Sequence, residues 1–459
     1  MTAHLLNCLS NFQMRSRIIN ERIIQFGTGN FLRGFADYFV DKLNKENLYN
    51  GNIVIVSPTN SKTIDTLNAQ NCRYNLYLRG IENGKEICER TEINSISRAV
   101  NPYKDFDTYL ELAQNPDFRF IITNTTEAGI AFVAEDKYED RPAKSFPAKL
   151  TQLLYARYKA GLNGFVIFAC ELIDNNGKQL EKCVLDYANL WNLGKDFCEW
   201  ITKENDFCNT LVDRIVTGYP KDEAEQFCAE IGYDDKLLDT AEPYHLWVIE
   251  GDYEKELPLQ KASLNVIWTN DVKAYKKMKV RILNGSHTSL VFPSMLCGID
   301  TVKKSLEDKD LNAFLNTCLF KYILPTLGET EENRQFANAV LERFSNPYIK
   351  HMWKSISLNS ISKFTARVLP TIHDYVKKHN TLPKSLVFSL ACLIEYYKTN
   401  DVQDDKTAVE YIKTHSVKDI LSNAEFWDCD LSDMLDLVEE SMDKIHSNGI
   451  REAIKWALL

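Results

Sequence analysis

Residues 22–33 read Arg-Ile-Ile-Gln-Phe-Gly-Thr-Gly-Asn-Phe-Leu-Arg, a short apolar run that ends in a glycine turn. Apolar residues then recur at helical spacing from residue 30 to about residue 49, so this segment predicts a strand, a tight turn and a helix. Two glycines let the backbone approach a pyrophosphate closely, and the start of a helix offers N–H groups to that anion. Leu32 replaces the third glycine of the G-x-G-x-x-G pattern, so a plain strand–helix turn is the alternative.

The first part of the chain alternates strands and helices. A helix is expected over residues 144–159 and a β-hairpin around Asn83-Gly84, where the flanking residues alternate in polarity. Further strands are expected over residues 52–57, 118–123, 164–170, 245–250 and 264–268. Repetition of strand, helix and strand is typical of a mostly parallel sheet.

The second part of the chain is expected to be mainly helical. All glycines except Gly328 and Gly449 lie in residues 1–300, and glycine is disfavoured inside helices. Apolar spacing predicts helices around residues 386–394 and 434–445. We therefore expect an α/β Rossmann-type domain over residues 1–270 and a mainly α-helical substrate and catalytic domain over residues 271–459.

Composition excludes several function classes. The net charge of −10 is not that of a nucleic-acid binder, and no run of 18 apolar residues predicts a membrane span. The 12 cysteines include no C-x-x-C pair, so no zinc or other metal site is expected. Scattered thiols favour a reducing, cytoplasmic location. The N-terminus has no cationic start before its apolar stretch, so it does not resemble a signal peptide.

A second loop, Asn124-Thr-Thr-Glu-Ala-Gly129, follows the strand over residues 118–123 and lies where ligands gather in a doubly wound sheet. It could contact the nicotinamide half of a dinucleotide, and a helix start capped by Asn124 is the alternative. Residues 57–60 read Ser-Pro-Thr-Asn, without a carboxylate for the adenosine ribose or an arginine for a 2′-phosphate. NADP gains no support, and NAD is the expected cofactor. The expected cofactor contacts are Ile24, Gln25, Phe26, Gly27, Thr28, Gly29, Asn30, Phe31, Leu32, Arg33, Asn124 and Thr125.

The third motif is Lys279-Val-Arg-Ile-Leu-Asn-Gly-Ser-His287. On a regular α-helix, Asn284 lies about 140° and His287 about 80° round from Lys279, whereas Arg281 lies about 200° away. A lysine that exchanges a proton with a hydroxyl, next to an amide and an imidazole that hold its oxygen, suits alcohol–ketone chemistry. The alternative is a solvated lysine beside a capping asparagine and a packed histidine.

This K-x-R-x-L-N-x-x-H block, followed by a helical region, resembles the mannitol dehydrogenase family of polyol-specific long-chain dehydrogenases. Val212-Asp-Arg-Ile215 matches the V-D-R-I element of that family, although Thr217 stands where the family has Pro or Ser. Residues 24–33, 124–129, 170–174 and 355–364 carry further likeness, and the resemblance runs from about residue 22 to residue 372.

The resemblance implies roles for individual residues. Lys279 corresponds to the general acid/base, and Asn284 and His287 correspond to ligands of the substrate oxygen. Lys363 and Asp213 correspond to positions in the substrate pocket. Two positions depart from the sugar-alcohol members. Glu171-Leu172 replaces an Asp-Asn pair whose Asn is an oxyanion donor, and Ser355 replaces an arginine. Both departures concern the substrate pocket, which includes Glu171, and both argue against mannitol as substrate.

Within the family, the likeness is greatest to members that reduce tagaturonate to altronate with NADH, and it implies that activity without a metal. Reduction of fructuronate, or interconversion of mannitol and fructose, are alternatives in the same class. A non-catalytic nucleotide-binding module and a phosphosugar isomerase or lyase are alternatives from other classes. The expected partner is a small sugar acid, without nucleic acid or membrane, and the expected state is a monomer or small homo-oligomer.

Overall fold

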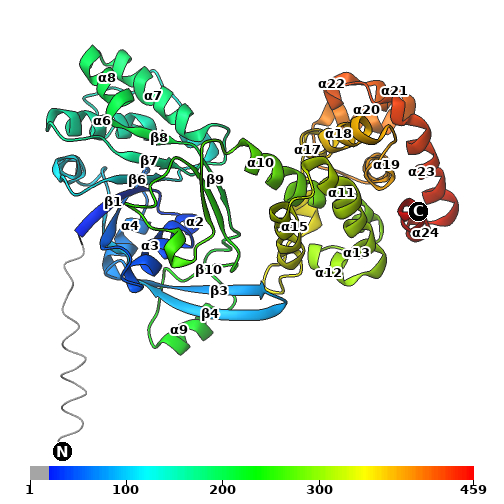
Figure 1. Cartoon of the computed structure of the whole chain (residues 1–459), viewed down its shortest axis with the longest axis horizontal. Coiled ribbons are helices and arrows are strands. Elements are labelled where there is room, and N and C mark those ends of the chain that lie inside the picture. The colour runs from blue at the N-terminus through cyan, green and yellow to red at the C-terminus, as the bar shows by residue number, and fades with distance from the viewer. Residues whose placement is uncertain (1–19) are drawn as a thin grey trace, which may run out of the picture. The chain divides into compact units, whose positions relative to one another are not determined.

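The computed structural model describes residues 20–459, so the segment in which no signal peptide is expected lies outside the described residues. The chain forms two compact units (Figure 1). Unit 1 contains the described residues up to Arg79 together with Ile87–Val272. Unit 2 contains Lys273–Leu459 and the short segment Gly80–Glu86.

A six-stranded parallel sheet forms the centre of unit 1, with the strand order β5-β2-β1-β6-β7-β8. Phe26, the last residue of β1, pairs with Val56 of β2 and Thr123 of β6, so these strands end at one edge of the sheet. The predicted Rossmann-type fold is confirmed. The strands are β1 (Asn20–Phe26), β2 (Gly51–Val56), β5 (Ile96–Val100), β6 (Phe120–Thr123), β7 (Val166–Ala169) and β8 (Asp206–Cys208).

Successive side chains of a strand point to opposite faces of the sheet, so the apolar strands form two hydrophobic cores, one on each face. Ile23 and its neighbours on one face pack with α2, α3 and α4, and Ile24 and its neighbours on the other face pack with α5 to α8. The helix expected over residues 30–49 is interrupted at Gly34-Phe35, where Phe35 leaves the helical conformation. The helices of unit 1 are α2 (Asn30–Arg33), α3 (Ala36–Lys45), α4 (Thr63–Ala69), α5 (Phe106–Glu111), α6 (Phe146–Lys159), α7 (Asn176–Leu190), α8 (Lys195–Glu204) and α9 (Ala224–Ile231).

Two small sheets accompany the main one. The strands expected at residues 245–250 and 264–268 form a separate sheet, β12-β11-β9, because they pair with each other and with β9. The predicted hairpin is confirmed, since Asn83 and Gly84 both adopt positive φ between β3 and β4. The strands are β3 (Tyr74–Glu82), β4 (Lys85–Ile93), β9 (Thr210–Asp213), β10 (Asp239–Ala241), β11 (Leu246–Glu250) and β12 (Val266–Thr269).

Unit 2 is helical in its long segment, as predicted. Its buried centre is formed by α11 and α19, whose side chains are buried on almost all sides. The tip of the β3–β4 hairpin belongs to this unit. The Gly84 N–H donates to Glu342 at 2.9 Å, and the Tyr348 hydroxyl donates to Glu86 at 2.7 Å.

The helices of unit 2 include those predicted around residues 386–394 and 434–445, which are α19 and α23. They are α10 (Lys273–Lys279), α11 (Gly285–Leu296), α12 (Val302–Glu307), α13 (Lys309–Asn316), α14 (Leu324–Leu327), α15 (Glu331–Phe344), α16 (Trp353–Ile356), α17 (Ser360–Arg367), α18 (Leu369–His379), α19 (Lys384–Thr399), α20 (Lys406–Thr414), α21 (Val417–Ser422), α22 (Ala424–Trp427), α23 (Leu435–Asn448) and α24 (Ile450–Leu458).

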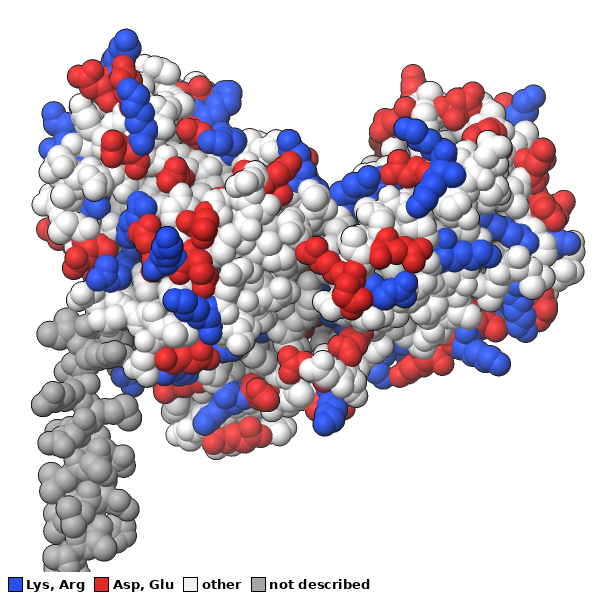
Figure 2. Space-filling view, viewed as in Figure 1, with Lys and Arg blue, Asp and Glu red and all other residues white. Residues whose placement is uncertain are grey.

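The surface carries mixed charge. Figure 2 shows Lys and Arg interspersed with Asp and Glu over the face in view. Within residues 20–459, no helix is long and apolar enough to cross a membrane.

Candidate functional site

The glycine turn after β1 brings three strand ends together. Gly27 has φ of +140°, and a Cβ there would lie 2.7 Å from the Asn124 carbonyl oxygen, so only glycine fits between the two loops. The Gly27 N–H donates to the Val56 carbonyl at 3.3 Å, and the Asn124 N–H donates to that of Phe26 at 3.0 Å. Gly29 differs, because a Cβ there would meet nothing within 4 Å. The turn is therefore tightly packed at its first glycine and open at its second.

Most of the other side chains predicted to contact the cofactor point into the protein. Ile24, Gln25, Phe26 and Leu32 are buried, and Arg33 is only 4% exposed, with its guanidinium donating to the Leu237 carbonyl at 2.6 Å. The turn itself offers Thr28, which is partly buried, and the exposed Gly29 and Asn30. The partly buried Phe31 stacks on Phe35 at 5.0 Å between ring centroids.

The loop after β6 is tied to the end of β7. The Asn124 amide donates to the Cys170 carbonyl at 2.6 Å, and a 3-10 turn (Glu127–Gly129) follows, so the alternative of a helix capped by Asn124 is wrong. The carboxylate of Glu171 accepts hydrogen bonds from the Thr123 hydroxyl at 2.9 Å and the Thr125 N–H at 3.0 Å. Burial raises the pKa of Glu171, and these hydrogen bonds oppose the rise. Glu171 thus holds the predicted cofactor loop in place.

The V-D-R-I element lies at the end of β9, where Asp213 is buried. Its arginine holds the end of α2, since Arg214 donates to the Gly34 carbonyl at 2.8 Å and to the Glu242 carbonyl at 2.8 Å. Burial lowers the pKa of Arg214 to about 10. No role is expected for this arginine from the sequence, and its hydrogen bonds show that it is a positioning residue.

Lys279, Asn284 and His287 lie on one continuous helical path in unit 2. The path is not the regular α-helix assumed from the sequence, because residues Val280–Asn284 form a π-helical turn between α10 and α11. A π turn accommodates roughly one extra residue, which places His287 about 20° from Lys279 instead of about 80°. Lys279 and Asn284 are partly buried. The wide turn therefore aligns the lysine and the histidine more closely than a plain helix would.

His287 is a buried imidazole with an unused nitrogen. The residue is 9% exposed, and its ring stacks on Phe344 at 4.1 Å between centroids, with His351 edge-on at 5.0 Å. Burial, followed by the charges of His351, Arg343 and Arg367, lowers the pKa of His287 well below its usual value, so the ring is neutral at pH 7. Within residues 20–459, Nε2 has no hydrogen-bond partner. A buried polar atom of this kind is suited to a ligand oxygen.

The two remaining basic residues of the sequence motifs have different surroundings. Lys363, on α17, donates from Nζ to the Ile356 carbonyl at 2.9 Å, and burial lowers its pKa. Arg281, which the spacing placed on another face, donates to Thr371 at 2.8 Å and to Asp374 at 3.1 Å on α18. Arg281 is therefore anchored to the neighbouring helix.

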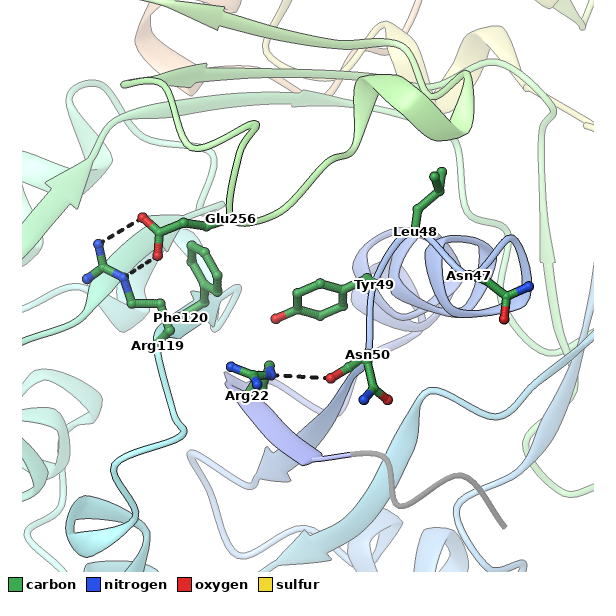
Figure 3. A pocket seen from close by; sticks show the side chains of 8 residues that line it. All are labelled: Arg22, Asn47, Leu48, Tyr49, Asn50, Arg119, Phe120 and Glu256. Atoms are coloured by element: carbon green, nitrogen blue, oxygen red, sulfur yellow. Dashed lines mark hydrogen bonds and ion pairs between the residues drawn. The ribbon is translucent and has the colours of Figure 1, made fainter. Parts of the chain in front are cut away.

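A pocket of about 390 Å³ lies at the other edge of the main sheet (Figure 3). Its lining includes Arg22, near the start of β1, and Arg119, just before β6, whose guanidinium is paired with Glu256 at 2.7 Å. Ligands of open α/β sheets bind beyond the carboxyl ends of the strands, so this pocket does not belong to the predicted site.

The sequence models of known families cover both parts of the chain. The mannitol dehydrogenase Rossmann domain matches residues 21–261, and the mannitol dehydrogenase C-terminal domain matches residues 271–447. The chain belongs to the mannitol dehydrogenase family. The resemblance inferred from the lysine, asparagine and histidine block is thereby confirmed.

Curated relatives in the family match over nearly their full length. An altronate oxidoreductase of Bacillus subtilis (strain 168) is 42% identical over 455 residues, covering 95% of each chain. An altronate oxidoreductase of Klebsiella pneumoniae subsp. pneumoniae is 43% identical over 465 residues, covering 95% of this chain and 96% of the relative.

Solved structures show the same architecture. A D-sorbitol dehydrogenase in substrate-free form superposes with a TM-score of 0.85 at 25% identity, covering 95% of both chains. The Pseudomonas fluorescens mannitol 2-dehydrogenase, in a ternary complex with NAD and D-mannitol, has a TM-score of 0.70 at 22% identity, covering 96% of this chain and 95% of that one.

The predicted site residues of this family member fall into two groups. Unit 1 holds the two loops, Glu171 and Asp213, and unit 2 holds Lys363 and the lysine, asparagine and histidine block. Arg367, to which the sequence motifs assign no role, lies one helical turn beyond Lys363 on α17. The four-residue spacing places these two cations on one face of the helix.

Proposed function

We propose that this protein is an NAD-dependent oxidoreductase that reduces tagaturonate to altronate and catalyses the reverse oxidation. The carrying observation is the 42% identity, over 95% of both chains, with an altronate oxidoreductase. The orphaned Nε2 of His287, on the same helical path as Lys279, supports alcohol–ketone chemistry at this position.

The turn between β1 and α2 fits a dinucleotide. Gly29 leaves open space beside backbone N–H groups, and Gly27 allows the β1 and β6 loops to approach closely. A pyrophosphate requires this combination of room and donors. After β2 the chain offers Ser57, Thr59 and Asn60 but no arginine for a 2′-phosphate, which favours NAD over NADP. When bound, the cofactor supplies or receives the hydride.

The protein's own groups act on the substrate oxygen. In reduction, Lys279 Nζ gives a proton to the carbonyl oxygen as it becomes a hydroxyl, and in oxidation it takes that proton back. The Asn284 amide and the neutral His287 ring donate hydrogen bonds to the same oxygen while negative charge develops on it. Because His287 is neutral, it stabilises this charge by hydrogen bonding and does not compete with Lys279 as the acid.

Three further residues are proposed to contact the substrate or to position its pocket, on the strength of the family resemblance. They are Glu171, Asp213 and Lys363. The side chain of Glu171 is fully engaged with the β6 loop, so its contribution is proposed to act through the position of Thr125. All eleven described cysteines are free thiols, which supports the proposed cytoplasmic location.

The direct test is NADH oxidation by the purified full chain with tagaturonate, fructuronate and fructose, and with NADPH in parallel. We expect the highest kcat/KM with tagaturonate and NADH. A higher value with fructuronate or fructose would overturn the substrate assignment, and a preference for NADPH would overturn the cofactor assignment. A lack of NADH oxidation with all three substrates would favour the non-catalytic alternative.

A further inference from the structure

Helix α17 places two cations next to the helical path that carries Asn284 and His287. Lys363 and Arg367 lie four residues apart and therefore share one face of α17. The end of α17 packs closely against the start of α11, since a Cβ on Gly285 would lie 3.3 Å from the Arg367 carbonyl oxygen. The charge of Arg367 also reaches the imidazole of His287, because it contributes to the lowered pKa of that ring. Arg367 is thus a neighbour of the proposed reacting centre within unit 2.

The guanidinium of Arg367 is half-buried and unpaired. Burial alone lowers its pKa, and within residues 20–459 no side chain or carbonyl forms a hydrogen bond or an ion pair with it. The nearby carboxylate of Asp404 acts on Lys363 and is occupied by the Tyr397 hydroxyl at 2.6 Å and the Ile361 N–H at 3.0 Å. No anion of the described chain is therefore left for Arg367.

Other buried arginines of the protein have partners. Arg281 donates to Thr371 and Asp374, and Arg157 donates to several backbone carbonyls. Desolvating a cation without compensation is unfavourable, so such groups are normally paired. Arg367 departs from this rule at the place where the proposed substrate would be bound.

We propose that Arg367 binds the carboxylate of the substrate and is the residue that distinguishes a sugar acid from a neutral sugar. This inference rests on the proposed function, and it assigns the carboxylate to Arg367 rather than to Lys363, the other cation on this face of α17. Lys363 already donates to the Ile356 carbonyl, whereas the planar guanidinium is free to grip both carboxylate oxygens. A hexuronate carries its carboxylate at one end of the carbon chain and its ketone near the other. Binding at Arg367 would therefore orient the ketone toward Lys279.

A structural explanation also exists, because an arginine in the last turn of a helix interacts favourably with the helix dipole. That role would affect stability and would not distinguish between substrates. The experiment therefore has to separate binding of the carboxylate from a general loss of folding or activity.

The experiment compares Arg367→Met and Arg367→Lys with wild type in the full chain. Arg334→Met serves as the matched control, because Arg334 is an exposed arginine of the same unit, 3.4 Å from Glu329. KM is measured for tagaturonate and fructose, and inhibition constants for altronate and its neutral counterpart altritol. The altritol measurement keeps the comparison valid if fructose is reduced too slowly.

Loss of a charge-assisted contact should raise KM for tagaturonate, and the inhibition constant of altronate, by about 10- to 150-fold in Arg367→Met. The constants for fructose and altritol should change by less than about threefold, as should the dissociation constant of NADH. Arg367→Lys should recover part of the loss, and Lys363→Met should cost less than Arg367→Met. If Arg367→Met does not fold, the loss on acidic ligands relative to the loss on neutral ligands is measured with Arg367→Lys instead.

Equal losses on acidic and neutral ligands, or no loss on either, would overturn the proposal for Arg367. Its failure is distinguishable from failure of the proposed function, which is judged on wild type alone. If wild type prefers fructuronate, the tagaturonate assignment fails while the same ratio, measured with fructuronate, still tests Arg367. If wild type reduces fructose and neither acid, both proposals fail.

Discussion

Substitution of Gly29 should separate cofactor binding from folding. The backbone of Gly29 is extended, with φ of −73° and ψ of 164°, and a Cβ there meets nothing within 4 Å. The Cβ of Gly29→Val is therefore accommodated without backbone strain and without a clash within the described chain. Loss of a glycine N-cap costs up to about 1 kcal/mol, and the reduced entropy of the unfolded chain offsets about 0.4–1 kcal/mol of it. The melting temperature should change by less than about 4 °C.

The same side chain would occupy the space proposed for the pyrophosphate. Loss of one charge-assisted hydrogen bond there should raise the dissociation constant of NADH by about 10- to 150-fold, measured by calorimetry or by NADH fluorescence. Gly27→Val is the contrasting variant. Its φ of +140° and the oxygen 2.7 Å away predict strain of about 1–3 kcal/mol or more, so its melting temperature should fall. An unchanged NADH affinity in a folded Gly29→Val protein would refute the placement of the cofactor.

The remaining predictions concern protons. Lys279→Ala should lower kcat by about 10²–10⁴ with little change in NADH affinity, and turnover within about threefold of wild type would remove Lys279 from its proposed role. Burial lowers the pKa of His287, so in acid the unfolded chain binds a proton that the folded protein excludes. The free energy of unfolding should therefore fall as the pH drops below about 6.5. His287→Gln should reduce that fall, measured by urea titration. Burial raises the pKa of Asp37 to about 7 from an ordinary value of 3.8. The protonated carboxyl therefore contributes to the stability of the fold in acid, and this contribution is lost as the pH rises through 7. Asp37→Asn should flatten the change of melting temperature between about pH 4 and pH 8, and an unchanged slope would contradict the raised pKa.

Local patterns were sufficient to predict the main sheet. The strands β1, β2, β6 and β7 are apolar runs bounded by glycine or polar residues, and their period differs clearly from that of the helices between them. The hairpin was predictable because Asn83 and Gly84 tolerate positive φ. These features depend on neighbours in the sequence, so the sequence alone reveals them.

The conformation of the loop after β6, the π turn and the surroundings of Arg367 depend on tertiary contacts, which the sequence pattern does not reveal. The sequence allowed Asn124 to cap a helix, but in the fold its side-chain N–H donates to the Cys170 carbonyl at 2.6 Å, and the turn that follows begins after Thr126. The π turn before α11 leaves the apolar pattern nearly unchanged, so its effect on His287 is invisible in the sequence. A lone arginine in the sequence also does not reveal whether it has a partner, and for Arg367 only the packed structure does.

The tip of the β3–β4 hairpin belongs to unit 2, so during synthesis the hairpin is made well before the helices that it contacts. Gly84 and its partner Glu342 are separated by 258 residues, so a ribosome adding about 5–20 residues per second delivers the partner roughly 13 to 50 s after the hairpin. β4 is an edge strand of its sheet, and its exposed Lys and Glu side chains oppose pairing with other chains. We therefore expect the charges of β4 to limit pairing of the hairpin with other chains before Glu342 has been synthesised.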